Sequence, residues 1–292
     1  MLNRFARTFT AARSLSGMAF GLTVALAIAA PSGAARAQSG IDILKRSMQT
    51  YQRLATYKGT SSVSVSMLYN GKPVQTNYDQ VELRMRRPNM ITIIFTNPSG
   101  TRAIYDDGTT MYVYGAALNQ YNRIPAQKTL QGELVMLGAI GVQASLDPLY
   151  FFVIGKVPET LSSVNLVGTV NLNGKSCYYI TGGSHAPAHK ARMPNGKIIQ
   201  VPATSAKWKW WIEKSTLLLV KIEAIDPHVP MKVGLKKGKK VTQTMLIMAQ
   251  RVSNTVLEAT PNANLPDNAF QFAPPPGATE RKSIGEILKS GK

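Results

Sequence analysis

The sequence predicts an α+β protein that is mainly β: one large curved antiparallel sheet that forms an incomplete β-barrel, with an N-terminal helix and a central helical lid or plug. Apolar and polar residues alternate with a period of two over most of the chain beyond residue 60. Turn dipeptides such as Asn70-Gly71 and Asn173-Gly174 separate the alternating runs, as in β-hairpins. Helical spacing of apolar residues occurs in two places, 40–57 and 130–154.

Composition excludes several classes of protein. The 292 residues include 44% hydrophobic residues, which is enough for a buried core and too many for a disordered chain. One cysteine excludes an intramolecular disulfide framework, and three histidines leave little room for a metal site. The formal charge of +19 is the extreme feature. It has three interpretations: attraction to anionic partners, binding of nucleic acid, or solvation in an acidic or unusual habitat.

The N-terminus has the pattern of a secretory signal peptide. Residues 1–17 carry arginines and no acid, 18–31 are apolar, and Ala35-Arg36-Ala37 places small residues at the −3 and −1 positions of a cleavage site. The apolar run is shorter than the roughly 20 residues of a spanning helix. We therefore expect a cleaved segment over 1–37 and a periplasmic mature protein, whose charge is +15 after the loss of four arginines.

The first half of the mature chain predicts a helix followed by hairpins. Residues 40–57 place five apolar side chains on one stripe, and we expect Gly59 to end that helix. Strands follow around Asn70-Gly71, over 81–86, after Pro88, and on both sides of Asp107-Gly108.

The second half begins with the apolar helical region 130–154, in which Asp147-Pro148 resembles a helix start. Strands resume around Asn173-Gly174 and run to the alternating pair Phe270 and Phe272. Residues 182–206 predict a long loop, and the lysines of 228–240 predict a basic hairpin tip. We expect one domain over 38–278 and a basic tail over 279–292.

The order of these elements predicts the cavity. Two short helical regions used as simple cover cannot satisfy a large sheet whose strands are mostly apolar on one face, so either two sheets pack together or one large curved sheet wraps around the helices. A single curved sheet around a helical plug fits this order, and any space that the plug leaves is an apolar cavity suited to an acyl chain.

A series of short motifs runs along 40–278. They are, in order, Arg86-Arg87-Pro88, Tyr105-Asp106-Asp107-Gly108, Asn119-Gln120-Tyr121, Pro125, Leu137-Gly138, Asn173-Gly174 with Cys177, Trp211-Ile212-Glu213, and Phe270-Gln271-Phe272 before the prolines. Together they resemble the exported LolA/LolB-like superfamily, in a predicted periplasmic branch of unknown function. The resemblance implies an incomplete antiparallel β-barrel with an α-helical lid. It also implies a carrier role, since the best-known members hold the acyl chains of lipoproteins in the cavity.

The candidate lipid site consists of inward strand positions and of apolar positions in the helical lid. Packing in a filled core is the competing interpretation, and a half-barrel makes the two overlap. The candidates are Val63, Val65, Met67, Leu83, Ile93, Tyr112, Leu134, Leu137, Ile140, Phe151, Phe152, Trp208, Trp210 and Val220.

Catalytic and metal chemistry have weak support. His185 and His189 have Pro187 between them, which argues against a helical metal pair, and Cys177 lies in a predicted strand with no histidine nearby in sequence. We favour a turn at Asp106 and Asp107 over a catalytic pair. No hydrolase, zinc-protease, P-loop or dinucleotide motif occurs, so we expect no enzyme activity and no cofactor.

The lysine cluster has two interpretations, a solvated loop or a contact with an anionic membrane or envelope protein. Export argues against nucleic acid as the partner. The cluster consists of Lys232, Lys236, Lys237, Lys239 and Lys240.

These patterns predict a periplasmic carrier or chaperone for a lipid or for lipoprotein acyl chains. The alternative is a periplasmic sensor that binds an anti-sigma partner in envelope-stress signalling. A structural role with a self-filled cavity is a third hypothesis.

Overall fold

A computed structural model describes residues 39–139, 148–155, 157–158, 160–192, 198–201, 203–237 and 240–282. The predicted signal peptide, the lid candidate Ile140, the proposed helix cap Asp147 and the tip lysine Lys239 lie outside these residues. Residues 38–292 form one compact unit, which the following paragraphs describe.

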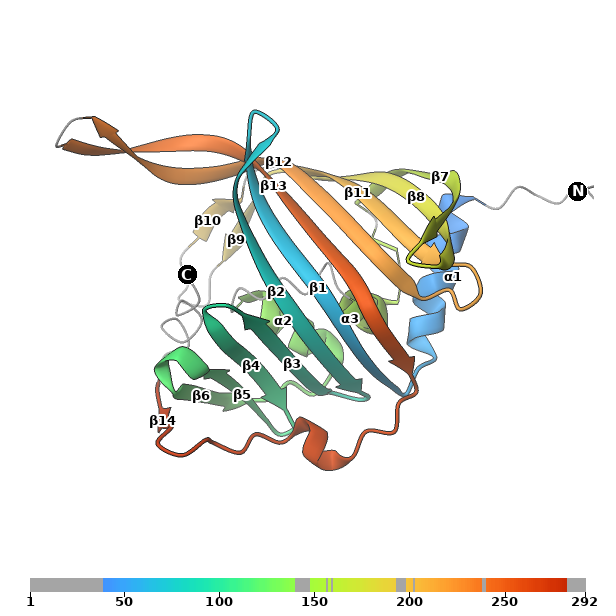
Figure 1. The fold of residues 1–292 in the computed structure, drawn as a ribbon, viewed down its shortest axis with the longest axis vertical. Helices are drawn as coiled ribbons and strands as arrows, with labels where there is room; N and C mark the ends of the chain where they lie inside the picture. The colour runs from blue at the N-terminus through green and yellow to red at the C-terminus, as the bar shows by residue number, and fades with distance from the viewer. Residues whose placement is uncertain are drawn as a thin grey trace, which may run out of the picture. The chain divides into compact units, whose positions relative to one another are not determined.

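The unit is built on one twelve-stranded sheet with the order β14-β6-β5-β4-β3-β2-β1-β13-β12-β11-β8-β7, and a separate pair β10-β9 (Figure 1). Neighbouring strands are antiparallel except β14 and β6, which are parallel. The strands are β1 Thr56–Tyr69, β2 Lys72–Arg86, β3 Met90–Asn97, β4 Gly100–Asp106, β5 Thr110–Gly115, β6 Gln120–Pro125, β7 Leu161–Leu172, β8 Lys175–Ala186, β9 His189–Arg192, β10 Ile198–Val201, β11 Thr204–Glu213, β12 Leu219–Lys237, β13 Lys240–Pro261 and β14 Thr279–Glu280.

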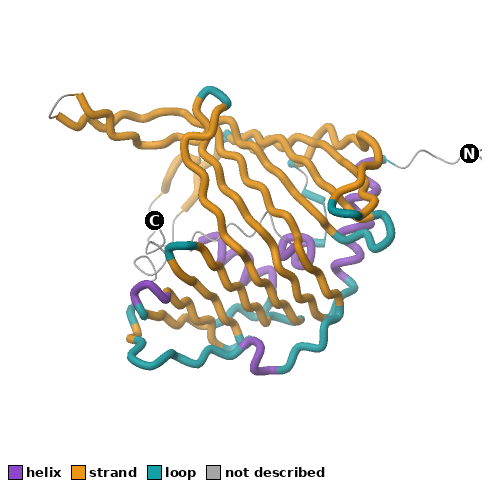
Figure 2. The backbone as a smooth tube through the Cα atoms, in the orientation of Figure 1, coloured by secondary structure: helices purple, strands orange, loops and turns teal. Residues whose placement is uncertain are grey.

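The sheet is open. Its end strands β14 and β7 do not pair with each other, and α2 and α3 lie against one face (Figures 1 and 2). The predicted fold class, a mainly β protein with a large incomplete barrel and helices at the start and in the middle, is confirmed.

Two tight turns fix the register of the hairpins. Asn70 and Gly71 have φ of 50° and 76°, and Asn173 and Gly174 have φ of 53° and 79°. Positive φ at both central residues is the type I′ geometry that matches the twist of paired strands, and asparagine and glycine tolerate it. Both predicted turns are therefore confirmed.

Three α-helices lie in the described part of the chain: α1 Gly40–Gln52, α2 Leu130–Ala139 and α3 Pro148–Ile154. The Ser39 side chain caps α1 by accepting a hydrogen bond from the Asp42 amide (3.2 Å). The prediction that α1 continues to residue 57 is wrong. Tyr57 instead pairs with Met85 in the sheet and packs its buried ring 5.7 Å from Tyr51, so strand pairing and core packing override the local helical spacing.

None of the helices in the described residues combines the length and the apolar character that a bilayer crossing requires.

The core lies between the helices and the inner face of the sheet. The alternation in β2 buries Val81, Leu83 and Met85 and leaves Glu82 and Arg84 on the outer face, partly exposed, as the sequence predicts. Helix α1 contributes four fully or nearly fully buried side chains to the same core: Ile43, Leu44, Met48 and Tyr51.

Two predictions for irregular segments are corrected. Residues 182–206 are not one long loop: β8 runs to Ala186, β9 and β10 form a small hairpin, and β11 begins at Thr204, which pairs with Ala186. The pairing of neighbouring strands overrides the loop-like Gly and Pro content here. The predicted last strand, which contained Phe270 and Phe272, is also wrong. Asp267–Phe270 forms a 3-10 turn that buries Phe270 completely.

The C-terminal segment 262–282, here called the strap, crosses the outer face of β2 to β6 (Figure 1). The Ala269 carbonyl accepts a hydrogen bond from Thr92 Oγ1 (2.8 Å), and Phe272 packs against four tyrosines at centroid distances from 5.2 to 5.6 Å. Strand β14 then pairs with β6 and forms the end strand of the sheet, so two residues of the predicted basic tail lie in the sheet.

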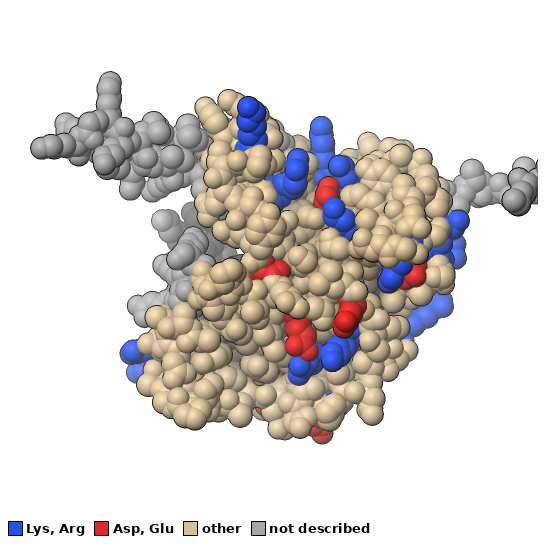
Figure 3. Space-filling view, in the orientation of Figure 1, with Lys and Arg blue, Asp and Glu red and all other residues tan. Residues whose placement is uncertain are grey.

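Charges on the outer face are mixed. Lysine and arginine side chains alternate there with acidic ones (Figure 3), for example where Lys221 lies 2.7 Å from Glu223. The predicted basic hairpin is confirmed as a backbone feature: β12 and β13 pair as far as Lys237 opposite Lys240.

Candidate functional site

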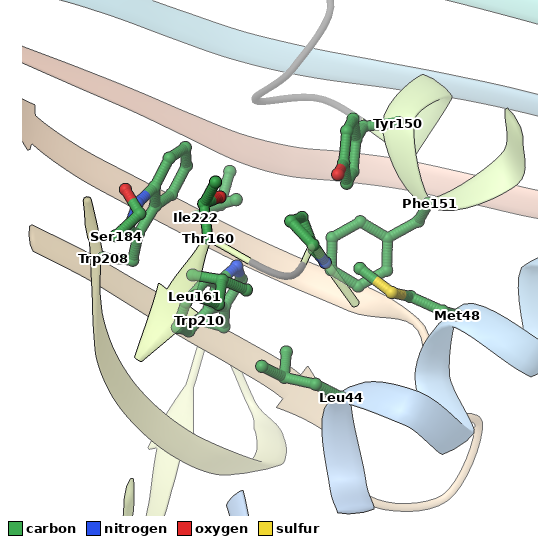
Figure 4. A pocket seen from close by; sticks show the side chains of 11 residues that line it. Leu44, Met48, Tyr150, Phe151, Thr160, Leu161, Ser184, Trp208, Trp210 and Ile222 are labelled. Atoms are coloured by element: carbon green, nitrogen blue, oxygen red, sulfur yellow. The ribbon is translucent and has the colours of Figure 1, made fainter. Parts of the chain in front are cut away.

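An apolar pocket of about 220 Å³ lies between α1, α3 and the β7, β8, β11 and β12 end of the sheet (Figure 4). It is partly open to solvent. Its lining is dominated by aliphatic and aromatic groups, and none of the lining residues is charged. They are Leu44, Met48, Tyr150, Phe151, Pro158, Thr160, Leu161, Ser184, Trp208, Trp210 and Ile222.

The helices supply one wall. Leu44 and Met48 lie four residues apart on α1, so both point the same way, and α3 places Phe151 beside them (Figure 4). The Phe151 ring packs edge-on against Tyr51 at 5.7 Å, which fixes its orientation. Short segments of two helices therefore form one apolar wall of the pocket.

The sheet supplies the opposite wall through two tryptophans. Trp208 and Trp210 share a face of β11 because residues two apart in a strand point the same way, and their rings stack at 5.9 Å with 5° between planes. Gly182 on β8 lies next to Trp210. A Cβ there would approach the Trp210 ring to 3.1 Å, so the absence of a side chain gives the ring its room.

Few polar groups reach the pocket. The Trp208 indole N–H donates to Ser184 Oγ (2.8 Å), which leaves the Ser184 hydroxyl proton available to a ligand. Tyr150 turns its hydroxyl toward the pocket (Figure 4), and burial raises the pKa of this phenol, so it stays a neutral donor. The arrangement favours an apolar ligand with at most one or two hydrogen-bonding atoms.

Arg87 connects the segment that follows α1 to helix α3 through hydrogen bonds to two backbone carbonyls. Its Nε donates to the Leu54 carbonyl (3.1 Å) and its Nη2 to the Phe152 carbonyl (2.7 Å), while the guanidinium lies 4.4 Å from the Phe152 ring centroid. Burial lowers the pKa of Arg87. Gln52 donates to the same Phe152 carbonyl (2.8 Å). The last residue of α1, the residue that follows β2 and helix α3 therefore meet at the Phe152 carbonyl.

The candidate lipid residues fall into three groups. Phe151, Trp208 and Trp210 line the pocket, and Tyr112 lies on the opposite face of the sheet, 5.2 Å from Phe272 beneath the strap. The rest of the described candidates lie in or against the packed interior: Leu83, Ile93, Leu137, Phe152, Met67 and Val220 are buried, and Val63, Val65 and Leu134 are partly buried.

Sequence reasoning missed most of the lining. Leu44 and Met48 were on the predicted apolar stripe of the first helix, so that stripe was the available indication. Ser184 lay in the segment expected to be a loop, and Thr160 and Pro158 have no distinguishing pattern. Their place in the pocket depends on how β7 and β8 pair.

The histidine and cysteine considered as metal-binding or catalytic candidates do not lie together. Exposed His185 lies 3.1 Å from Ser205 Oγ, and Cys177 is fully buried, where burial raises the pKa of its thiol. In the part of the chain that the structure describes, no three His, Cys, Asp or Glu side chains gather as a metal site would require.

Structural comparisons give distant similarities. The chain is similar to the LolA superfamily protein of Nitrosomonas europaea (9% identity, TM-score 0.33, 80% of this chain and 98% of that chain). It is also similar to the lipoprotein LppX of Mycobacterium tuberculosis (15%, 0.38, 74% and 92%) and to LprF from Mycobacterium bovis (11%, 0.39, 82% and 97%).

Sequence comparison is more direct. No curated protein matches this sequence. The model of one protein family, described as "Predicted periplasmic protein (DUF2092)", matches residues 40–236, which span α1 and most of the sheet, including all lining residues of the pocket. The chain belongs to this family of predicted periplasmic proteins, DUF2092.

Proposed function

We propose that the protein is a non-catalytic periplasmic carrier or chaperone that holds a lipid, or an acyl chain of a lipoprotein, in the pocket between α1, α3 and β11. The observation that supports this most directly is the lining: aliphatic and aromatic side chains around Trp208 and Trp210, with no charge among them. An ionised headgroup would lose its hydration there without gaining a counter-ion, whereas an alkyl chain loses only its contact with water.

Affinity would then depend on chain length. Burial of one methylene stabilises a complex by about 0.8 kcal/mol, which is roughly a fourfold change in Kd. We expect the affinity for a series of single-chain alkyl probes with a neutral head to rise by about this factor per methylene, and to level off once the pocket is full.

The first experiment is native mass spectrometry, with organic extraction, of protein purified from the periplasm of its own host. A co-purifying lipid or acylated peptide supports the proposal and identifies the ligand. An apo mass, with no uptake of any probe of the alkyl series, contradicts it and favours a filled interior. A co-purifying envelope protein without lipid would favour the sensor hypothesis instead.

A pair of variants locates the site. Leu161→Trp adds an indole to the pocket wall and should abolish probe binding while the fold remains intact by circular dichroism. Leu257→Trp makes the same change at an exposed position of β13 and should leave binding unchanged. Equal loss in both variants, or unchanged binding in Leu161→Trp, would contradict the assignment of this pocket.

We also propose that the β12–β13 hairpin contacts an anionic membrane surface through Lys232, Lys236, Lys237, Lys239 and Lys240. The sequence gathers five lysines between residues 232 and 240, and the pairing of the Lys237 and Lys240 backbones supports the proposal. Each lysine near an anionic bilayer contributes about 1 kcal/mol. Replacement of all five by glutamine should therefore abolish salt-sensitive binding to vesicles that contain phosphatidylglycerol. Binding that is unaffected by the replacement would contradict this contact.

A further inference from the structure

Two buried carboxyl groups meet beneath the first turn of α2. Glu133 belongs to this turn and Asp106 is the last residue of β4, and both are fully buried. One oxygen of each group has a backbone partner: Asp106 Oδ1 accepts from the Gly108 amide (2.8 Å), and Glu133 Oε1 accepts from the Gln127 amide.

The second oxygen of each group lacks a donor. Asp106 Oδ2 and Glu133 Oε2 are both buried without a hydrogen-bond partner among the described residues, although the two side chains lie within hydrogen-bonding reach of each other. Two ionised carboxylates in this position would repel each other and leave both oxygens unsatisfied. A single proton between them removes the repulsion and satisfies both oxygens.

The surroundings favour this proton. Burial, followed by the neighbouring Asp106 carboxyl group, raises the pKa of Glu133 to about 8, and burial also raises the pKa of Asp106. The remaining charged group that acts on the pair from the described part of the chain is Asp107, whose negative charge also raises the pKa of Asp106. Asp107 itself accepts hydrogen bonds from the amides of Thr109 and Thr110 (2.8 Å each).

The pair joins two parts of the fold. Glu133 is carried by α2, and Asp106 by the sheet. Helix α2 also buries Leu130 and Leu137 in the common core, and it contacts α3, which supplies Tyr150 and Phe151 to the pocket. A change in the position of α2 against the sheet would therefore also affect α3, which forms part of the pocket wall.

We propose that one proton shared between Asp106 and Glu133 holds α2 against the sheet. Loss of this proton favours local opening of α2 and weakens the packing of the helical wall of the pocket. The release of α2 depends on the buried pair alone. Its consequence for a bound lipid rests on the proposed function.

The direction of the pH dependence follows from linkage. When α2 opens, the pKa of Glu133 falls from about 8 to its ordinary value of 4.5, so at neutral pH opening releases a proton. The equilibrium constant for opening should therefore rise by up to about tenfold per pH unit between these two values, and should be level above pH about 8. The helix is held most firmly at acid pH.

The test is amide hydrogen exchange of peptides that cover 130–139 in the full chain, from pH 5 to 8.5, corrected for intrinsic exchange. The wild type should lose protection by about a hundredfold between pH 5 and 7. Glu133→Gln should remove this slope, because its carboxamide donates to Asp106 and does not titrate. Glu258→Gln makes the same change on an exposed part of β13 and should keep the slope.

A flat wild-type profile, or an unchanged slope in Glu133→Gln, would overturn the proposal. If Glu133→Gln does not fold, Asp106→Asn makes the equivalent change from the sheet side, and the wild-type profile needs no variant. The alkyl series separates the two proposals. A pH slope in hydrogen exchange without binding of any probe contradicts the carrier function and supports the shared proton. Binding of the probes without a pH slope supports the carrier function and contradicts the shared proton.

Discussion

Removal of the Phe270 side chain tests whether the strap is part of the cooperative fold. Phe270 is fully buried on the outer face, and the Arg86 guanidinium lies 4.9 Å from its ring centroid. The neighbouring Ala269 carbonyl is held by Thr92. A change to alanine therefore removes a buried ring from a site that the adjacent backbone holds in place.

The expected loss is large. Truncation of a buried phenylalanine costs about 3–5 kcal/mol, because the transfer free energy is lost and the surroundings relax only partly. The cation–π contact with Arg86, whose side chain is 24% exposed, adds on the order of 0.5–1 kcal/mol. We expect Phe270→Ala to lower the free energy of unfolding by about 4 kcal/mol.

Urea unfolding followed by tryptophan fluorescence measures this loss at the far side of the sheet, since the three tryptophans lie on β11. Phe272→Ala is the matched control: its ring is half-buried among the tyrosines, so its removal should cost about 2 kcal/mol. A loss below about 1 kcal/mol for Phe270→Ala would refute the reasoning, because the strap would then lie outside the cooperative unit.

Three further predictions concern the helical wall and the pocket. Gly155→Ala should lower stability by about 2 kcal/mol in urea unfolding, because φ is +63° there and a Cβ would overlap the Gln52 side chain. Arg87→Met should cost about 2 kcal/mol through loss of its two carbonyl bonds, and should raise hydrogen exchange in 148–154. Gly182→Ala should push the Trp210 ring into the pocket and shorten the best-binding probe in the alkyl series. Each of these three predictions is contradicted if the variant gives the same value as the wild type in its assay.

Local patterns predicted the framework because short-range chemistry decides it. Asn-Gly pairs adopt positive φ at low cost, so the hairpins at Asn70 and Asn173 could be placed directly. The alternation in β2 identified its buried face, and the apolar stripe of the first helix contained Leu44 and Met48. These features depend on residues that are close together in the chain.

Long-range pairing decided what local patterns misjudged. The stretch around Ser184 has the composition of a loop, yet it forms strand because β11 supplies partners for its backbone. Tyr112 alternates like a cavity residue, but the strap covers its face, since Phe272 returns to it across the sheet. The end of α1 gives way to β1 because Tyr57 packs in the core beside Tyr51.

The sequence by itself predicted a periplasmic protein and determined a mainly β fold, two helical regions and a surplus of positive charge, since composition and periodicity carry that information. Only the tertiary structure decided which apolar residues border a pocket and which fill the core. It also decided that Asp106 and Glu133 meet. Both depend on contacts between residues far apart in the chain, and periodicity assigns a residue to a face without specifying what lies opposite.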